Sequence, residues 1–253
     1  MSDLRERLFI STTADDAHAL AAEYGLGLEI ADFCTAYNMD LLFAEYDQKA
    51  REKMQGIRRF IFHAAYNELC PAAIDPLIRE HTARRFHQAI DLSLRYGIKK
   101  IVIHSGFIPQ IYFPQWFIPE SVKFWQSFMS EVPDDVSICL ENVMEQDPQM
   151  LPEIIRQTDD PRLRLCLDIG HAFSRSEPRP LSEWIDAAVP YLSHVHIHDH
   201  DGSADLHRTL GEGSIDLPFV LDRIISRAPK ATFTVENMHA AGSVFWLLEN
   251  QFI

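Results

Sequence analysis

Short apolar runs rich in β-branched residues alternate with longer helical patterns along the chain, and this alternation is what most constrains the fold. Strands that alternate with helices are typical of parallel βαβ units. No linker, low-complexity stretch or break in composition interrupts the pattern over residues 1–253. Eight strand–helix pairs without a break favour one closed barrel, so we expect an α/β fold with a single (β/α)8 TIM barrel domain over residues 1–253. The expected strands are Leu8–Thr13, Leu26–Ala31, Arg59–Ala64, Lys99–Ser105, Val136–Val143, Leu163–Ile169, Leu192–Asp199 and Ala231–Asn237.

The size and composition of the chain agree with this fold. A chain of 253 residues is the size of one such barrel, and 47% hydrophobic residues indicate a globular protein. The clearest expected helix runs from Ala73 to Tyr96 and stops at Gly97, and the last one runs from near Gly242 to Ile253.

The charge balance narrows the classes of partner. The net charge is −14, from 37 acidic and 23 basic side chains, which disfavours broad contact with nucleic acid. The apolar runs are shorter than the roughly 18 residues that span a bilayer, and Met1–Arg7 lacks the apolar core of a secretion signal. We therefore expect a soluble cytoplasmic protein with no membrane partner. No CxxC spacing is present, and we expect four free thiols, at Cys34, Cys70, Cys139 and Cys166.

Potential metal ligands end most of the expected strands. In a barrel of this kind the carboxyl ends of the strands converge on one mouth, which holds the active site. Asp205 and His207 lie two residues apart just after the seventh strand, and His171 follows the sixth. Burying several carboxylates without cations would be strongly unfavourable, so the pattern favours a polynuclear metal centre. The candidate ligands are His63, His104, Glu141, Asp168, His171, His196, Asp205, His207 and Glu236.

Several neighbouring side chains are open to more than one interpretation. His194, His196 and His198 share one face of the seventh strand at different depths, so we expect His196 to bind metal and His198 to orient a ligand or face the substrate. Glu29 ends the second strand and is equally a candidate for a substrate contact, an orienting group or a salt-bridge partner. The arginines of the mouth loops either hold a phosphate or are solvated: Arg175, Arg179 and Arg208.

An aromatic segment, Phe107–Phe117, follows the fourth strand directly. As a free surface loop it would expose a large apolar area. We expect it to form a wall or lid of the mouth, to pack in a homo-oligomer, or both.

The motifs around these donors resemble a family, the xylose isomerase-like or endonuclease IV-like TIM barrels. The likeness covers nearly the whole chain and rests on five stretches: Phe62-His63-Ala64-Ala65-Tyr66-Asn67, Ile103-His104-Ser105-Gly106, Leu140-Glu141-Asn142, Leu167-Asp168-Ile169-Gly170-His171-Ala172-Phe173, and Asp205-Leu206-His207 before Leu210-Gly211-Glu212-Gly213. For endonuclease IV, the resemblance implies that the nine candidate ligands hold three zinc ions that cut DNA at abasic sites.

The loops depart from the DNA-binding pattern of that enzyme. Neither Asp32–Asn38 nor Tyr66–Pro71 carries Lys or Arg, so we expect a small-molecule substrate and no DNA partner. Small members of the superfamily resemble sugar or sugar-phosphate isomerases and epimerases that use one divalent ion, matching Glu141, Asp168, His196 and Glu236.

Two hypotheses about an enzymatic function follow, and a barrel that binds metal without catalysis is a third hypothesis. The favoured one is an isomerase or epimerase of a sugar or sugar phosphate, with Glu141 and Glu236 as acid and base and His171 orienting a substrate oxygen. The alternative is a zinc-dependent phosphoester hydrolase acting on an abasic site or on a small phosphorylated substrate. Both require a divalent metal, zinc or manganese, as one to three ions.

Overall fold

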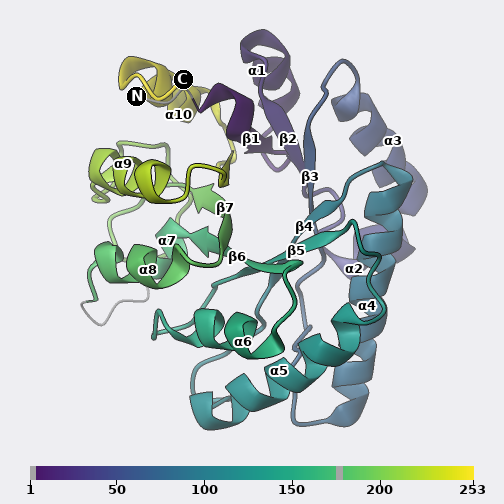
Figure 1. The fold of residues 1–253 in the computed structure, drawn as a ribbon. Coiled ribbons are helices and arrows are strands. Elements are labelled where there is room, and N and C mark those ends of the chain that lie inside the picture. The colour runs from purple at the N-terminus through teal and green to yellow at the C-terminus, as the bar shows by residue number, and fades with distance from the viewer. Residues whose placement is uncertain (1–3, 175–178) are drawn as a thin grey trace.

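Eight parallel strands close into a barrel in the order β1 to β8, as the sequence predicts (Figure 1). The computed structural model describes residues 4–174 and 179–253. The strands are β1 Leu8–Ser11, β2 Gly27–Ile30, β3 Phe60–His63, β4 Lys100–His104, β5 Ser137–Glu141, β6 Leu163–Asp168, β7 Leu192–Ile197 and β8 Thr232–Val235. Each lies inside or within one residue of its expected range.

Helices surround the barrel and follow the strands in turn (Figure 1). They are α1 Ala17–Tyr24, α2 Ala36–Asp40, α3 Phe43–Met54, α4 Pro76–Arg95, α5 Pro114–Met129, α6 Met150–Thr158, α7 Ile169–Ser174, α8 Leu181–Ala188, α9 Leu217–Arg227 and α10 Ala241–Glu249, with a short 3-10 turn, η1 Arg5–Arg7, before β1. Among the described residues, no helix combines the length and the apolar character needed to cross a membrane.

Helix α4 differs from its sequence pattern at its first turn. It begins at Pro76 rather than Ala73, because Asp75 caps it by accepting a hydrogen bond from the Leu77 amide at 2.8 Å. Ile74 and Leu77, which the periodicity assigns to the core, are 64% and 66% exposed. The packed part of the helix therefore starts later, and its buried face includes Phe86 and Ile90.

Two apolar clusters stabilise the barrel. The larger one fills the space between the strands and the helices. The smaller one lies on the inward faces of five strands and consists of Phe9, Ile61, Val102, Cys139 and Cys166. The four cysteines are free thiols, as expected, and three of them are buried.

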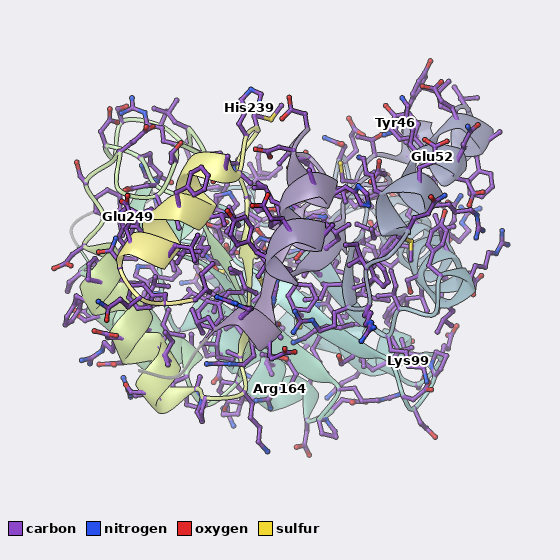
Figure 2. The ribbon with its side chains drawn as sticks, turned by 90° about the horizontal axis from the view of Figure 1, so that it is seen from above. Tyr46, Glu52, Lys99, Arg164, His239 and Glu249 are labelled. Atoms are coloured by element: carbon purple, nitrogen blue, oxygen red, sulfur yellow. The ribbon has the colours of Figure 1, made fainter. Side chains whose placement is uncertain are left out.

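Strand direction and register place the polar residues at one end of the barrel. In the turned view of Figure 2, Lys99, just before β4, and Arg164, near the start of β6, lie at the lower end, and His239, beyond the end of β8, lies at the upper end. The β4–β5 register sets His104 beside Glu141. The β6–β7 register sets Asp168 beside His196. The upper end is therefore the mouth at which the candidate ligands gather.

Candidate metal centre

The structure brings all nine candidate ligands together at the mouth. His63, His104, Glu141 and Asp168 are the last residues of their strands, and Glu236 directly follows β8. His171 lies in α7, His196 in β7, and Asp205 and His207 in the loop between β7 and α9. Three groups of ligand atoms account for all nine, and within each group these atoms lie within 4.8 Å of one another. Two further groups of this kind overlap with them: Glu29 with His63 and Glu236, and Cys166 with His194 and His196.

The first group joins two histidines to one oxygen of Glu141. The Nε2 atoms of His63 and His104 lie 3.4 and 3.3 Å from Glu141 Oε2. Glu141 Oε2 is buried and has no hydrogen-bond partner among the described residues. An unpaired buried carboxylate oxygen facing two imidazole nitrogens is an arrangement that a cation would satisfy.

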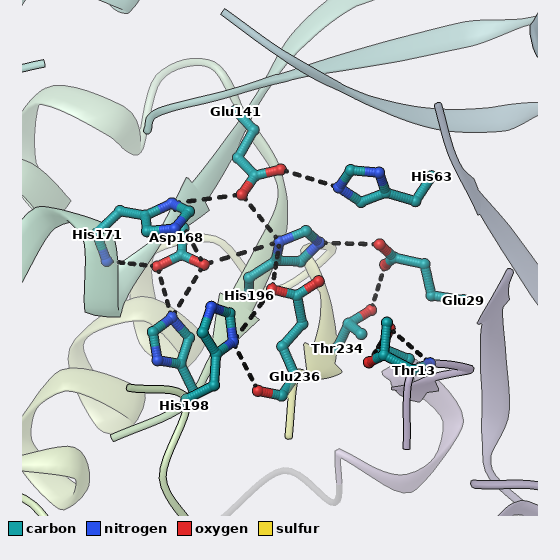
Figure 3. Close-up of polar contacts among 12 residues, drawn as sticks. Thr13, Glu29, His63, Glu141, Asp168, His171, His196, His198, Thr234 and Glu236 are labelled. Carbon is teal, nitrogen blue, oxygen red and sulfur yellow. Dashed lines mark hydrogen bonds and ion pairs between the residues drawn. The ribbon is translucent and has the colours of Figure 1, made fainter. Parts of the chain in front are cut away.

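The second group uses the other oxygen of Glu141. His196 Nδ1 lies 3.2 Å from Glu141 Oε1, 3.8 Å from Asp168 Oδ2 and 3.4 Å from Glu236 Oε2. This nitrogen is also buried without a hydrogen-bond partner in the part of the chain that the structure describes. Figure 3 shows the Glu141 carboxylate between the two groups, with one oxygen turned to His63 and the other to His196.

The third group belongs to the loop after β7 and to α7. Asp205 Oδ2 lies 3.0 Å from His171 Nε2, and Asp205 Oδ1 lies 3.3 Å from His207 Nε2. His198 also reaches this group, but its Nε2 lies closer to Asp168, 3.1 Å from Oδ1. Its Nδ1 is buried without a partner among the described residues, so His198 lacks the orienting contact that His63, His171 and His207 have. We therefore assign His198 to holding Asp168, one of the two roles the sequence left open.

The donor spacings suit small divalent ions. Two ligands of one tetrahedral zinc ion, each about 2.0–2.1 Å from the metal, lie about 3.3 Å apart. The contacts within the three groups span 3.0 to 3.8 Å. A mixed imidazole and carboxylate set is one that zinc prefers, and manganese also accepts carboxylates. The residues therefore fit up to three divalent ions, with Glu141 shared by two of them.

In four of the histidines, the ring nitrogen that faces away from the ligand group has a contact that fixes the orientation of the ring. His63 Nδ1 contacts the carbonyl of Ala64, His171 Nδ1 that of Asn142 and His207 Nδ1 that of Glu236, each at 2.9 Å. An N–H donated to a carbonyl leaves the opposite nitrogen unprotonated and turned to the metal. In His196 the order is reversed, because Nε2 contacts Glu29 Oε1 at 3.0 Å and Nδ1 faces the second group.

Two asparagines that the sequence analysis passed over hold the ligand segments in place. The Asn142 side chain accepts from the Asp168 amide and donates to the Asp168 carbonyl, at 2.9 and 3.0 Å. The Asn237 side chain donates to the carbonyls of His207 and Arg208. Both follow a candidate ligand glutamate. The Glu-Asn pair that ends both the fifth and the eighth expected strand is the sequence signal by which they could have been found.

The electrostatics of the centre reflect buried opposite charges. Burial acts to raise the pKa values of Glu141 and Asp168, but the neighbouring histidines outweigh it and hold both pKa values below the usual range. Burial acts to lower the pKa of His171, but Asp168, Asp205 and Glu141 raise it to about 10. In the same way Asp205 and Glu236 outweigh burial and raise the pKa of His207 to about 9. Without cations, protons on these histidines balance the carboxylates.

We expect the metal affinity of the third group to rise with pH. His171 and His207, with pKa values of about 10 and 9, carry protons at neutral pH when no cation is bound, and only neutral imidazole binds metal. Each proton that zinc must displace lowers the apparent affinity roughly tenfold per pH unit below its pKa. Calorimetric zinc titrations from pH 6 to 9, in buffers of different ionisation enthalpy, measure both affinity and proton release. A flat profile would contradict this prediction.

The aromatic segment and the arginines of the mouth loops are only partly exposed or are paired with acids. The segment Phe107–Phe117 is divided, because Phe107 and Phe117 are buried in the core while Phe113 is 66% exposed, and its end forms the first turn of α5. Tyr66 stacks on the ring of His104, with 4.4 Å between the ring centroids.

The two described arginines of the mouth loops are paired with acids. Arg208 lies 2.9 Å from Asp201, and Arg179 lies 3.7 Å from Glu183. Arg175 lies outside the described residues.

Comparisons with known proteins identify relatives of the chain. A family model described as xylose isomerase-like TIM barrel matches residues 6–242. An uncharacterized protein of Methanocaldococcus jannaschii is 27% identical over 195 residues, which cover 73% of this chain and 66% of that protein. A probable endonuclease 4 of Thermoplasma acidophilum is 24% identical over 185 residues, which cover 66% of this chain and 63% of that protein. The chain thus spans just under two thirds of the length of these curated relatives.

Solved structures share the fold. A D-tagatose 3-epimerase-like protein superposes with a TM-score of 0.72 at 22% identity, covering 97% of this chain and 96% of the other. A Thermus thermophilus protein soaked with zinc chloride superposes with a TM-score of 0.74 at 22% identity, covering 97% of each chain. At this level of identity the likeness establishes the fold alone.

Proposed function

The chain belongs to the xylose isomerase-like TIM barrel family, and from this membership and the donor geometry we propose that it is a zinc-dependent hydrolase of a phosphoester in a small sugar-like metabolite. The observation that carries the proposal is the Glu141 carboxylate, which presents one oxygen to each of two ligand groups. Paired ions held at a fixed spacing stabilise the attacking and leaving oxygens of a phosphoryl displacement. The sequence favoured an isomerase, but one ion in the second group would leave five of the nine donors without a role.

The protein side chains divide the work around the ions. When bound, the ions would supply positive charge to the phosphoryl oxygens and lower the pKa of water. Both oxygens of Glu141 face ligand groups, so Glu141 is poorly placed to accept a proton. Glu236 is 13% exposed in its side chain and uses only Oε2 in its contacts with His196 and His207 among the described residues. Its Oε1 is therefore the oxygen we assign to take the proton of the attacking water.

A small substrate fits the charge of the chain better than DNA. The net charge is −14, and the described arginines of the mouth loops are paired with acids, so the phosphate would depend on the ions for its countercharge. Affinity for duplex DNA depends on Lys and Arg at many phosphates. We therefore propose that the partner is a small phosphorylated molecule and not nucleic acid.

An isomerase or epimerase of a sugar is the second candidate. It is favoured by the second group alone, in which Glu141 and Glu236 both approach His196 Nδ1 and could exchange a proton at a carbon beside a carbonyl. The solved D-tagatose 3-epimerase-like protein has the same fold. His171 fits its proposed role of orienting a substrate oxygen less well, because its two ring nitrogens contact Asn142 and Asp205.

One experiment separates the two candidates. Zinc-loaded protein is incubated in D2O with a panel of sugar phosphates, simple phosphodiesters and free ketoses, and followed by 31P and 1H NMR. We expect inorganic phosphate or a phosphomonoester product without deuterium in the sugar, and no cleavage of an abasic-site duplex at physiological salt. Deuterium at a carbon next to the carbonyl, without phosphoester cleavage, would replace the hydrolase by the isomerase. The Glu236→Gln variant serves as the control, because it should lose either reaction.

A further inference from the structure

Glu29 is a fully buried carboxylate inside the barrel, one residue before the end of β2. Its Oε1 lies 3.0 Å from His196 Nε2, and its Oε2 lies 2.9 Å from His194 Nε2 and 2.6 Å from the Thr234 hydroxyl. Both oxygens therefore accept hydrogen bonds. Glu29 also lies within 4.8 Å of ligand atoms of His63 and Glu236, but it is already satisfied by its hydrogen bonds. Figure 3 shows Glu29 on the opposite side of the His196 ring from Glu141.

The contacts of Glu29 continue down the barrel to a lysine. A carboxylate only accepts, so His194 and His196 each donate to it from Nε2, and the Nδ1 atom of each ring faces a different neighbour. His194 Nδ1 lies 2.6 Å from the Thr232 hydroxyl, which accepts from Lys100 Nζ at 2.9 Å. Lys100 also donates to the Ser193 carbonyl at 2.8 Å. An ordered column thus joins the Lys100 cation, through Thr232 and His194, to the Glu29 anion and then to His196.

We infer that Glu29 is the positioning residue of the metal centre, which fixes His196 in the tautomer and rotamer that turn Nδ1 to the second group. Three other ligand histidines are held by backbone carbonyls and present Nε2. His196 alone among these four presents Nδ1, and Glu29 accepts the hydrogen bond from its other nitrogen. The buried anion is tolerated there because His194, His196 and Thr234 all donate hydrogen bonds to it.

The inference rests on the metal centre of the proposed function but not on its reaction. The test compares Glu29→Gln with Glu145→Gln, which replaces another buried glutamate of the mouth. Glu145 accepts hydrogen bonds from the Ser105 hydroxyl and from the amides of Val143 and Met144. It forms no hydrogen bond or ion pair with any of the nine donors among the described residues. Zinc affinity is measured by competition with a chelator of known affinity, and folding by circular dichroism. We expect Glu29→Gln to weaken one class of zinc site by about 10- to 100-fold and Glu145→Gln to leave all classes within about twofold. Equal affinities in Glu29→Gln and wild type would overturn the inference.

A measurement on the wild-type protein keeps the test independent of how the variants fold. In zinc-loaded protein with 15N-labelled histidine, the His196 ring should carry its proton on Nε2, whereas His63, His171 and His207 should carry it on Nδ1. The His196 signal is assigned by its loss in His196→Asn. A His196 ring protonated on Nδ1 would overturn the inference. Since neither readout uses turnover, an absence of hydrolase activity would leave this test intact.

Discussion

Replacing Glu141 by Ala should reduce the metal content of the protein from about three ions per chain to about two, because only the first group is left with fewer than three donors. Glu141 is the one residue shared by two ligand groups, with Oε2 facing His63 and His104 and Oε1 facing His196. Its loss leaves the first group with two donors and the second with three, while the third group keeps Asp205 and its histidines. Hydrolysis should fall by at least about 1,000-fold, because removing a group that acts together with others in a centre has effects of this size. Elemental analysis of protein purified at saturating zinc gives the stoichiometry.

The control for this experiment is Glu145→Gln, four residues along the chain. Glu145 is buried like Glu141, but its partners are Ser105 and two backbone amides. It should keep about three ions per chain. If Glu141→Ala also keeps three ions, Glu141 is not a shared ligand of two sites and that role fails.

Removing the metals should lower the melting temperature by at least about 10 °C, the shift expected for a single ion. An ion present at about 1,000 times its Kd stabilises the native state by about 4 kcal/mol, and in a chain of this size each kcal/mol shifts Tm by about 2–4 °C. The centre links β3, β4, β5, β6, β7 and the β7–α9 loop, so its loss releases contacts around most of the mouth.

Differential scanning calorimetry before and after dialysis against a chelator measures the change, and zinc should restore the original Tm. Glu141→Ala, which binds fewer ions, should show a smaller shift and provides the internal comparison. An unchanged Tm in protein shown to be metal-free would mean that the buried donors are stable on protons alone.

Much of the fold and of the gathering of the candidate ligands could be predicted from the sequence, because both depend on local pattern. Period and composition located the eight strands, and topology alone requires the ends of parallel strands in a barrel to meet. His104 and Glu141, far apart in sequence, are neighbours in the β4–β5 register for this reason. The spacing of Asp205 and His207 likewise predicted that both serve one group.

The parts that the sequence did not determine depend on side-chain direction. Nothing in the pattern around Glu29 says which neighbour its carboxylate meets, and three roles remained open until its distances to His194 and His196 were known. The apolar residues Ile74 and Leu77 fit helical periodicity, yet Ile74 precedes the Asp75 cap and Leu77 lies in the exposed first turn of α4. Whether a helical residue is buried depends on how the helix lies against the neighbouring helices and strands. A periodic sequence pattern does not contain this information.

The shared carboxylate would also couple the loading of the first two groups. An ion in the first group would orient Glu141 for the second group and would also repel an ion that binds there. Whatever the balance of these two effects, thermodynamic linkage makes the coupling reciprocal, so each group changes the affinity of the other by the same factor. Exchanging one ion for a different metal would therefore retune its neighbour as well, and the identity of the metals is a property of the pair rather than of either site.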